Sequence, residues 1–145
     1  MESITKSVVV PYTAEQMYEL VNNVTAYPEF LPWCSASQVH EQDEHYMKAS
    51  VSLASGAVKQ TFTTANTLTP GERIEVALVS GPFKQLNGYW SFEKAGDGMS
   101  KIDFRMSYEY KNRIIKLALN KIFTRIGDTL VSSFVERAHQ LYGKK

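Results

Sequence analysis

Residues 101–142 read KIDFRMSYEYKNRIIKLALNKIFTRIGDTLVSSFVERAHQLY, and the spacing of apolar side chains changes once along this stretch. From Lys101 to Tyr110 apolar and polar residues alternate, as in a strand with one covered face and one wet face. From Ile115 to Leu141 apolar residues recur every three or four positions, which predicts one amphipathic helix of about thirty residues, roughly 45 Å long. Such a helix is the element that would cover a sheet.

The region before this stretch supplies the rest of the sheet. Ile4 to Val10 is a β-branched run closed by Pro11, and Thr13 with Gln16 forms a capping box that predicts a helix starting near Ala14. From about residue 37 the alternation resumes, and turn-forming residues divide it into six strands. These breaks lie near residues 42–43, 55–56, 70–71, 81–82 and 96–98.

We therefore expect a single α+β domain over residues 1–145, with about seven antiparallel strands. A long helix cannot lie flat on a sheet that twists, so the sheet should curl around it. Where side chains of the two layers fail to meet, an apolar cavity would remain. Gly127 in the middle of the helix indicates either a bend or a close approach by another element.

A second segment is more distinctive. Residues 27–34 read YPEFLPWC, and the two prolines force the residues before them away from the α region. This segment resembles the signature of the coenzyme-Q-binding and ribosome-association toxin family, which has the START-like, or helix-grip, fold shared with polyketide cyclases. Further matches lie at residues 62–66, 81–83, 86–92 and 134–138, so the resemblance covers essentially the whole chain.

The resemblance implies a non-enzymatic binding protein for ubiquinone or a related polyprenyl lipid that supports respiratory electron transport. The lipid would be a ligand, with no covalently bound cofactor. Bacterial members of the family are also described as toxins that bind the large ribosomal subunit and block subunit association, which is the alternative. A polyketide cyclase-like enzyme is the third reading.

Two groups of residues are candidates for the ligand site. Phe30, Leu31 and Trp33 of the proline segment either plug the end of the core or line a pocket. The expected lining elsewhere is Phe62, Leu78, Leu86, Trp90, Phe104 and Met106 on the sheet, with Leu119, Phe123 and Ile126 on the helix. Without the resemblance these would read as ordinary core. Gln60, Asn66, Asn87 and Tyr108 are possible partners for a quinone oxygen.

A surface candidate comes from the charges. The net charge is only +1, but residues 1–47 hold seven acidic groups against Lys6 alone, so the remainder is basic. The start of the long helix carries five cations and no acid, namely Lys111, Arg113, Lys116, Lys121 and Arg125. These residues favour contact with anionic lipid headgroups or rRNA phosphates, or they form a solvated face. No feature indicates a DNA partner.

Little in the sequence favours catalysis. His40, His45 and His139 are scattered and lack metal-ligand spacing, and Cys34 follows Trp33 in an apolar neighbourhood typical of an inert thiol. We expect neither an enzyme nor a metal site. The chain shows no leader pattern and no apolar run of about 20 residues, so we expect a cytoplasmic protein, at most peripheral to a membrane or ribosome-associated.

Overall fold

The computed structural model describes residues 2–143 as seven strands, two α-helices and one 3-10 helix. In chain order the elements are β1 (Glu2–Val10), α1 (Ala14–Asn22), the 3-10 helix η1 (Val24–Glu29), β2 (Cys34–Gln42), β3 (Tyr46–Ser55), β4 (Val58–Thr69), β5 (Arg73–Ser80), β6 (Phe83–Gly96), β7 (Met99–Tyr110) and α2 (Arg113–Tyr142). Each strand break predicted from turn residues lies at the last residue of a strand or in the turn that follows it.

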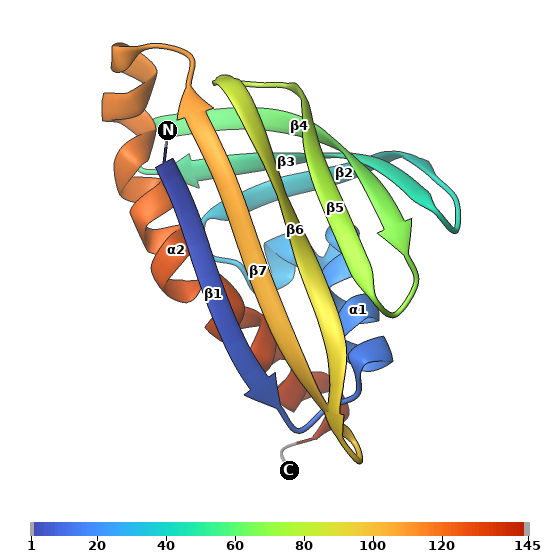
Figure 1. The fold of residues 1–145 in the computed structure, drawn as a ribbon. Helices are drawn as coiled ribbons and strands as arrows, with labels where there is room; N and C mark the ends of the chain where they lie inside the picture. Colours follow the sequence, from blue (N-terminus) through green and yellow to red (C-terminus); the bar gives the residue numbers. More distant parts are fainter. Residues whose placement is uncertain (1, 144–145) are drawn as a thin grey trace.

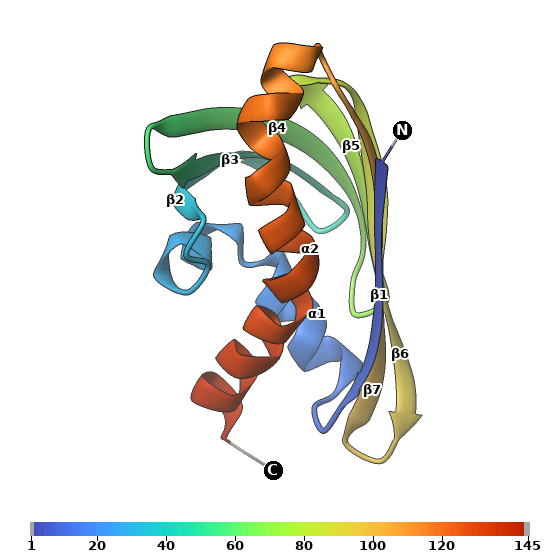
Figure 2. The same ribbon diagram turned by 90° about the vertical axis from the view of Figure 1, so that its left-hand side faces the viewer.

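The seven strands form one antiparallel sheet with the order β1-β7-β6-β5-β4-β3-β2. Consecutive strands from β2 to β7 are neighbours, and β1 joins the sheet beside β7, where Ile4 pairs with Met106. Figures 1 and 2 show the sheet curling around α2, with α1 and η1 across its open side. This is the α+β helix-grip architecture that the sequence predicts.

Side-chain caps set the starts of both α-helices. The Thr13 side chain accepts a hydrogen bond from the Gln16 amide while the Gln16 side chain accepts one from the Thr13 amide, so the predicted capping box is present. At α2 the Asn112 side chain accepts from the Ile115 amide at 2.9 Å. Both caps satisfy backbone N–H groups that a helix leaves unpaired.

The helix α2 runs unbroken through Gly127, and β1 passes close to the helix at this point. A Cβ placed on Gly127 would lie 3.5 Å from the Ile4 side chain. Of the two alternatives predicted at this glycine, the approach of Ile4 is an ordinary van der Waals contact that would admit a Cβ, and Figures 1 and 2 show the helix axis changing direction along its length.

The core lies between the concave face of the sheet and α2, and aromatic rings dominate it. Phe134 on α2 is 1% exposed and makes edge-to-face contact with Trp90 on β6 at 5.3 Å between ring centroids. Trp90 in turn contacts Phe104 on β7 at 4.5 Å. Ring pairs of this geometry add stability beyond the area they bury.

Candidate functional site

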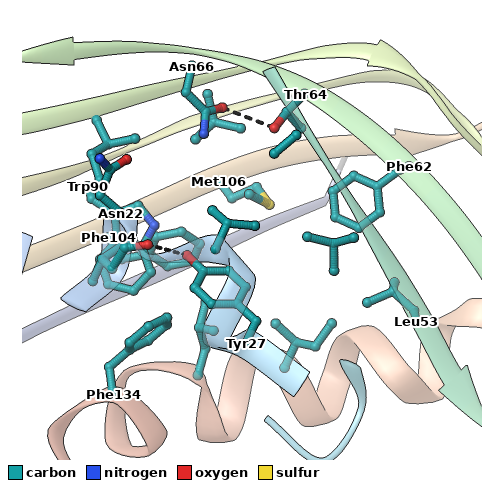
Figure 3. Close-up of a pocket in the computed structure, with 18 of the residues that line it drawn as sticks. Asn22, Tyr27, Leu53, Phe62, Thr64, Asn66, Trp90, Phe104, Met106 and Phe134 are labelled. Atoms are coloured by element: carbon teal, nitrogen blue, oxygen red, sulfur yellow. Dashed lines mark hydrogen bonds between the residues drawn. The ribbon is translucent and has the colours of Figure 1, made fainter. Parts of the chain in front are cut away.

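A cavity of about 110 Å³ lies inside the curl of the sheet. Strands β3 to β7 form its roof and α2 its floor, while the end of α1, η1 and Trp33 close one side. Figure 3 shows Phe62, Trp90 and Met106 reaching into this space from the sheet and Phe134 from α2. The space predicted between sheet and helix therefore exists.

Seven of the predicted ligand-site residues line this cavity: Trp33, Phe62, Trp90, Phe104, Met106, Phe123 and Ile126. Both tryptophans of the chain are among them. They come from β4, β6, β7, α2 and the segment before β2, so the fold gathers them from most of the chain's length.

The other five predicted residues lie outside the cavity wall. Leu31, Leu86 and Leu119 are at most 2% exposed but pack elsewhere in the core. For Leu86 on β6, alternation along the strand predicts which face the side chain takes but not how far along that face the cavity lies. Leu78 is half-buried and lies one residue past Ala77, where the β5–β6 pairing ends.

Phe30 acts as part of a plug at the end of the core. Its ring packs edge-to-face on the rings of Phe134 and Tyr27, with centroid separations of 5.2 Å and 6.2 Å. The Arg137 guanidinium carbon lies 5.1 Å from the centroid of the same ring. Of the two readings of the proline segment, plugging therefore describes Phe30, whereas Trp33 belongs to the cavity wall.

Several wall residues were not predicted, and the polar ones matter most. Asn22, Tyr27 and Thr64 all line the cavity. The Tyr27 hydroxyl donates to the Val21 carbonyl, and the Thr64 hydroxyl donates to Asn66 at 3.0 Å (Figure 3). The period-two pattern of β4 that placed Phe62 inward also places Thr64 and Asn66 inward, so that pattern held the signal for Thr64.

Asn66 is the only residue of the four suggested quinone partners that lines the cavity in the described part of the chain. Asn87 is exposed, Gln60 is half-buried outside the wall, and Tyr108 packs on Phe123 at 4.9 Å.

Two buried polar atoms in this wall have no hydrogen-bond partner among residues 2–143. They are Trp33 Nε1 and Asn22 Oδ1. A buried donor or acceptor left unpaired costs about 1–3 kcal/mol. Two wall residues, Trp33 and Asn22, therefore each keep one unpaired polar atom packed within the wall, which only a rearrangement of neighbouring side chains would expose to a ligand.

The cavity wall is electrically neutral. Within residues 2–143 no charged side chain belongs to its wall. Burial raises the pKa of the Tyr27 hydroxyl well above its ordinary value, so this group stays protonated. Burial also raises the pKa of the adjacent Cys34 thiol, which is 4% exposed, and the thiol is then a poor nucleophile at neutral pH.

The size of the cavity limits what it holds without rearrangement. An apolar cavity of about 150 Å³ accepts a benzene molecule, and pockets for drug-sized ligands measure roughly 300–1,000 Å³. A space of about 110 Å³ is smaller than either. A quinone ring with a prenyl tail would enter only if wall side chains moved apart.

The five predicted surface cations are all exposed on or just before α2. Lys116, Lys121 and Arg125 flank a shallow groove on the outer face of the helix, together with Leu117. None of the five takes part in an ion pair between residues that the structure describes.

Residues 2–143 form neither a metal-binding cluster nor a membrane-spanning helix. No group of three or more His, Cys, Asp or Glu side chains is placed to hold a metal ion there. Over the same residues no helix is long and apolar enough to span a bilayer. His40 and His45 lie on β2 and in the β2–β3 turn, while His139 contacts Tyr12 near the end of α2.

Known proteins share this architecture of a curled sheet around a long helix. A family model described as "Polyketide cyclase / dehydrase and lipid transport" matches residues 10–135. The chain belongs to this family. Its matched region includes all seven predicted residues that line the cavity.

Two relatives illustrate the names that similar proteins carry. "Ribosome association toxin RatA" of Pseudomonas aeruginosa is 45% identical over 140 residues, covering 97% of each chain. "Coenzyme Q-binding protein COQ10, mitochondrial" of Drosophila melanogaster is 27% identical over 143 residues, covering 96% of this chain and 59% of that protein. Neither name describes an enzyme.

Solved structures agree on the fold. An 18 kDa protein of Caulobacter crescentus has a TM-score of 0.76 at 29% identity, covering 99% of this chain and all of that one. The Zhui aromatase/cyclase of a Streptomyces species has a TM-score of 0.83 at 13% identity, covering 96% and 94%. The second likeness concerns the fold alone, since one fold hosts many functions.

Proposed function

We propose that this protein is a ribosome-associating factor of the kind its bacterial relatives are named for. The observation that carries the proposal is the identity of 45% over 97% of both chains with the ribosome association toxin of Pseudomonas aeruginosa. A match of that extent leaves no domain of the relative without a counterpart here. The partner would be the large ribosomal subunit, and binding there would block subunit association.

The charge distribution supports this proposal. Only one basic residue, Lys6, lies among residues 1–47, so the positive charge is concentrated in the rest of the chain. Contacts between Lys or Arg and rRNA phosphates release counterions, so they weaken steeply as salt rises. Ribosome binding by this protein should therefore be salt-dependent.

The test is sedimentation of purified protein with dissociated ribosomal subunits through sucrose gradients at low and high salt. We expect the protein in the large-subunit fraction at low salt, and fewer joined ribosomes when both subunits are mixed with it. Absence from that fraction at low salt would rule the proposal out.

The cavity supports a second candidate function, the binding of an apolar small molecule such as ubiquinone or another prenyl lipid. Its walls are apolar and neutral, and the unpaired Trp33 N–H is a donor suited to a quinone carbonyl. Each buried CH₂ is worth about 0.8 kcal/mol, so the tail supplies much of the affinity once the walls have opened. This candidate uses the interior, whereas ribosome binding uses the surface, so both functions fit one molecule.

Intrinsic fluorescence gives a direct test, because both tryptophans line the cavity. Added quinone should quench this fluorescence saturably, and organic extracts of fresh protein should contain a quinone or prenyl lipid. Ala49→Leu would fill the cavity, since Ala49 is 3% exposed in its wall. Ala36→Leu is the matched control, since Ala36 is exposed on β2.

We expect Ala49→Leu to abolish quenching and Ala36→Leu to leave it unchanged. Trp33→Phe keeps an aromatic ring but removes the N–H, so it should weaken quinone binding about tenfold, the loss of roughly one hydrogen bond. Clean extracts together with no saturable quenching would eliminate the ligand.

A further inference from the structure

The end of the molecule where α2 begins exposes two large apolar side chains. Ile114 is 78% exposed and Leu117 is 75% exposed, more than any other large apolar residue that the structure describes. They lie three positions apart in the first turns of α2 and therefore project from the same side of the helix. Figures 1 and 2 show this part of α2 standing at one end of the molecule.

Cations flank this apolar pair along the chain, and an acidic residue, Glu2, lines a surface hollow together with Arg113 and Lys116. Lys111, Arg113, Lys116 and Lys121 are all exposed, and residues 111–127 contain no acidic residue. Nearby Glu109 is already paired with Lys84 at 3.5 Å. We call residues 111–121 the α2 tip.

The placement of these cations opposes the local stability of the helix. A helix N-terminus carries a partial positive charge and favours acidic side chains, whereas α2 has no acid in its first turn and begins with Arg113. The cations at the helix start and the exposed side chains of Ile114 and Leu117 both lower local stability. Residues that break such local rules are expected at functional surfaces, so we interpret this surface as one that contacts a partner.

We propose that the α2 tip docks on an anionic phospholipid bilayer. Ile114 and Leu117 enter the boundary between headgroups and acyl chains, and the surrounding lysines and arginine contact lipid phosphates. An amphipathic surface with apolar and basic residues side by side suits that boundary. Phosphates of RNA would satisfy the cations alone and would leave the two aliphatic side chains in water.

The tip is also close to the cavity. The amide of Lys111 donates to the Pro82 carbonyl at 2.9 Å, which ties the tip to the β5–β6 turn. The ring of the next residue, Phe83, contacts the rings of Phe123 and Phe62, with centroid separations of 5.3 Å and 5.9 Å. Both Phe123 and Phe62 line the cavity. A single aromatic layer thus separates the docked end from the cavity. Docking of the α2 tip does not depend on the proposed binding of a lipid in the cavity. Transfer of a lipid from the bilayer through this layer into the cavity would depend on it.

The experiment is co-sedimentation of the full chain with vesicles of phosphatidylcholine alone or mixed with phosphatidylglycerol. We expect binding only to the anionic vesicles. The double variant Ile114→Ser with Leu117→Ser should weaken binding at least tenfold, because two large apolar side chains no longer leave water. The double variant Lys116→Gln with Lys121→Gln should weaken it about fivefold for each charge removed.

Matched controls lie at the far end of the molecule. Leu141→Ser removes an apolar side chain that is 53% exposed in the last turn of α2. Lys94→Gln with Lys101→Gln removes two exposed lysines from the β6–β7 hairpin. Both controls should bind anionic vesicles as the unmodified protein does.

Several results would overturn the proposal. One is equal binding to neutral and anionic vesicles, and another is unchanged vesicle binding by the Ile114/Leu117 variant. A third is loss of ribosome co-sedimentation in that variant without loss of vesicle binding, which would assign the tip to the ribosome. A fourth is a dimer of the unmodified protein that the variant dissociates, with no vesicle binding by either. Failure of ribosome or quinone binding would leave the vesicle result unaffected.

Discussion

Gly88 and Gly127 both lie against β-strands, yet substitution of the two should have opposite effects. Gly88 sits in β6 opposite Met106 of β7. A Cβ there would lie 2.2 Å from the Arg105 carbonyl oxygen and 2.8 Å from the Met106 Cα, and backbone atoms in a ladder cannot give way. At Gly127 a Cβ would meet only the flexible Ile4 side chain, at 3.5 Å or more.

We therefore predict that Gly88→Ala lowers the free energy of unfolding by about 3 kcal/mol, a typical cost of overpacking. Gly127→Ala should raise it by about 0.5–1 kcal/mol, because alanine replaces the poorest ordinary helix former. Urea unfolding followed by circular dichroism measures both. An unaffected Gly88→Ala protein, or a destabilised Gly127→Ala protein, would show that this packing is wrong.

At the scale of elements, two kinds of contact hold η1 and the proline segment to α2. The Arg137 guanidinium donates to the Glu29 carboxylate at 2.8 Å, and the Phe134 ring meets both Tyr27 and Phe30. The Glu29 side chain is 62% exposed, whereas Phe134 is 1% exposed. Water screens the ion pair, so the rings should supply most of the stability.

The prediction is that Phe134→Ala lowers the free energy of unfolding by about 3–5 kcal/mol, whereas Glu29→Gln lowers it by less than about 1 kcal/mol. Hydrogen exchange of residues 24–33 should accelerate strongly in the first variant and little in the second. Equal losses in the two variants would mean that the ion pair, rather than the rings, fastens this segment.

The elements that the sequence predicts well are those with a local cause. The Thr13 capping box sets the start of α1, and turn residues set the strand ends. The cavity wall depends on how far apart two layers lie at each point, which no local pattern contains. Leu119 and Phe123 share one apolar stripe of α2, but only Phe123 faces the cavity. Asn22 and Tyr27 face it because the chain turns from α1 into η1, and polar residues at a helix end carry no signal of that direction.

At the scale of the whole molecule, burial of ionisable side chains determines how stability responds to alkali. Burial raises the pKa of Tyr18, Tyr27, Tyr108 and Tyr110 above the ordinary value of 10.0, and that of Cys34 above 9.0. Each group is held neutral in the folded state and ionises more readily in the unfolded state. Their contribution to stability is therefore complete below about pH 9 and is lost as the pH rises further.

We predict that the free energy of unfolding falls progressively above pH 9, and that the tyrosinate absorbance of these four buried tyrosines appears together with unfolding. Each buried tyrosine that ionises on unfolding adds about 1.4 kcal/mol per pH unit to the slope. Tyr110→Phe should make the slope shallower by about that amount above pH 10, because the unfolded variant releases one proton fewer. Urea unfolding at a series of pH values measures both slopes. Full tyrosinate absorbance from a protein whose free energy of unfolding had not changed would mean that these hydroxyls are open to water, and the tight packing between sheet and helix would be refuted with them.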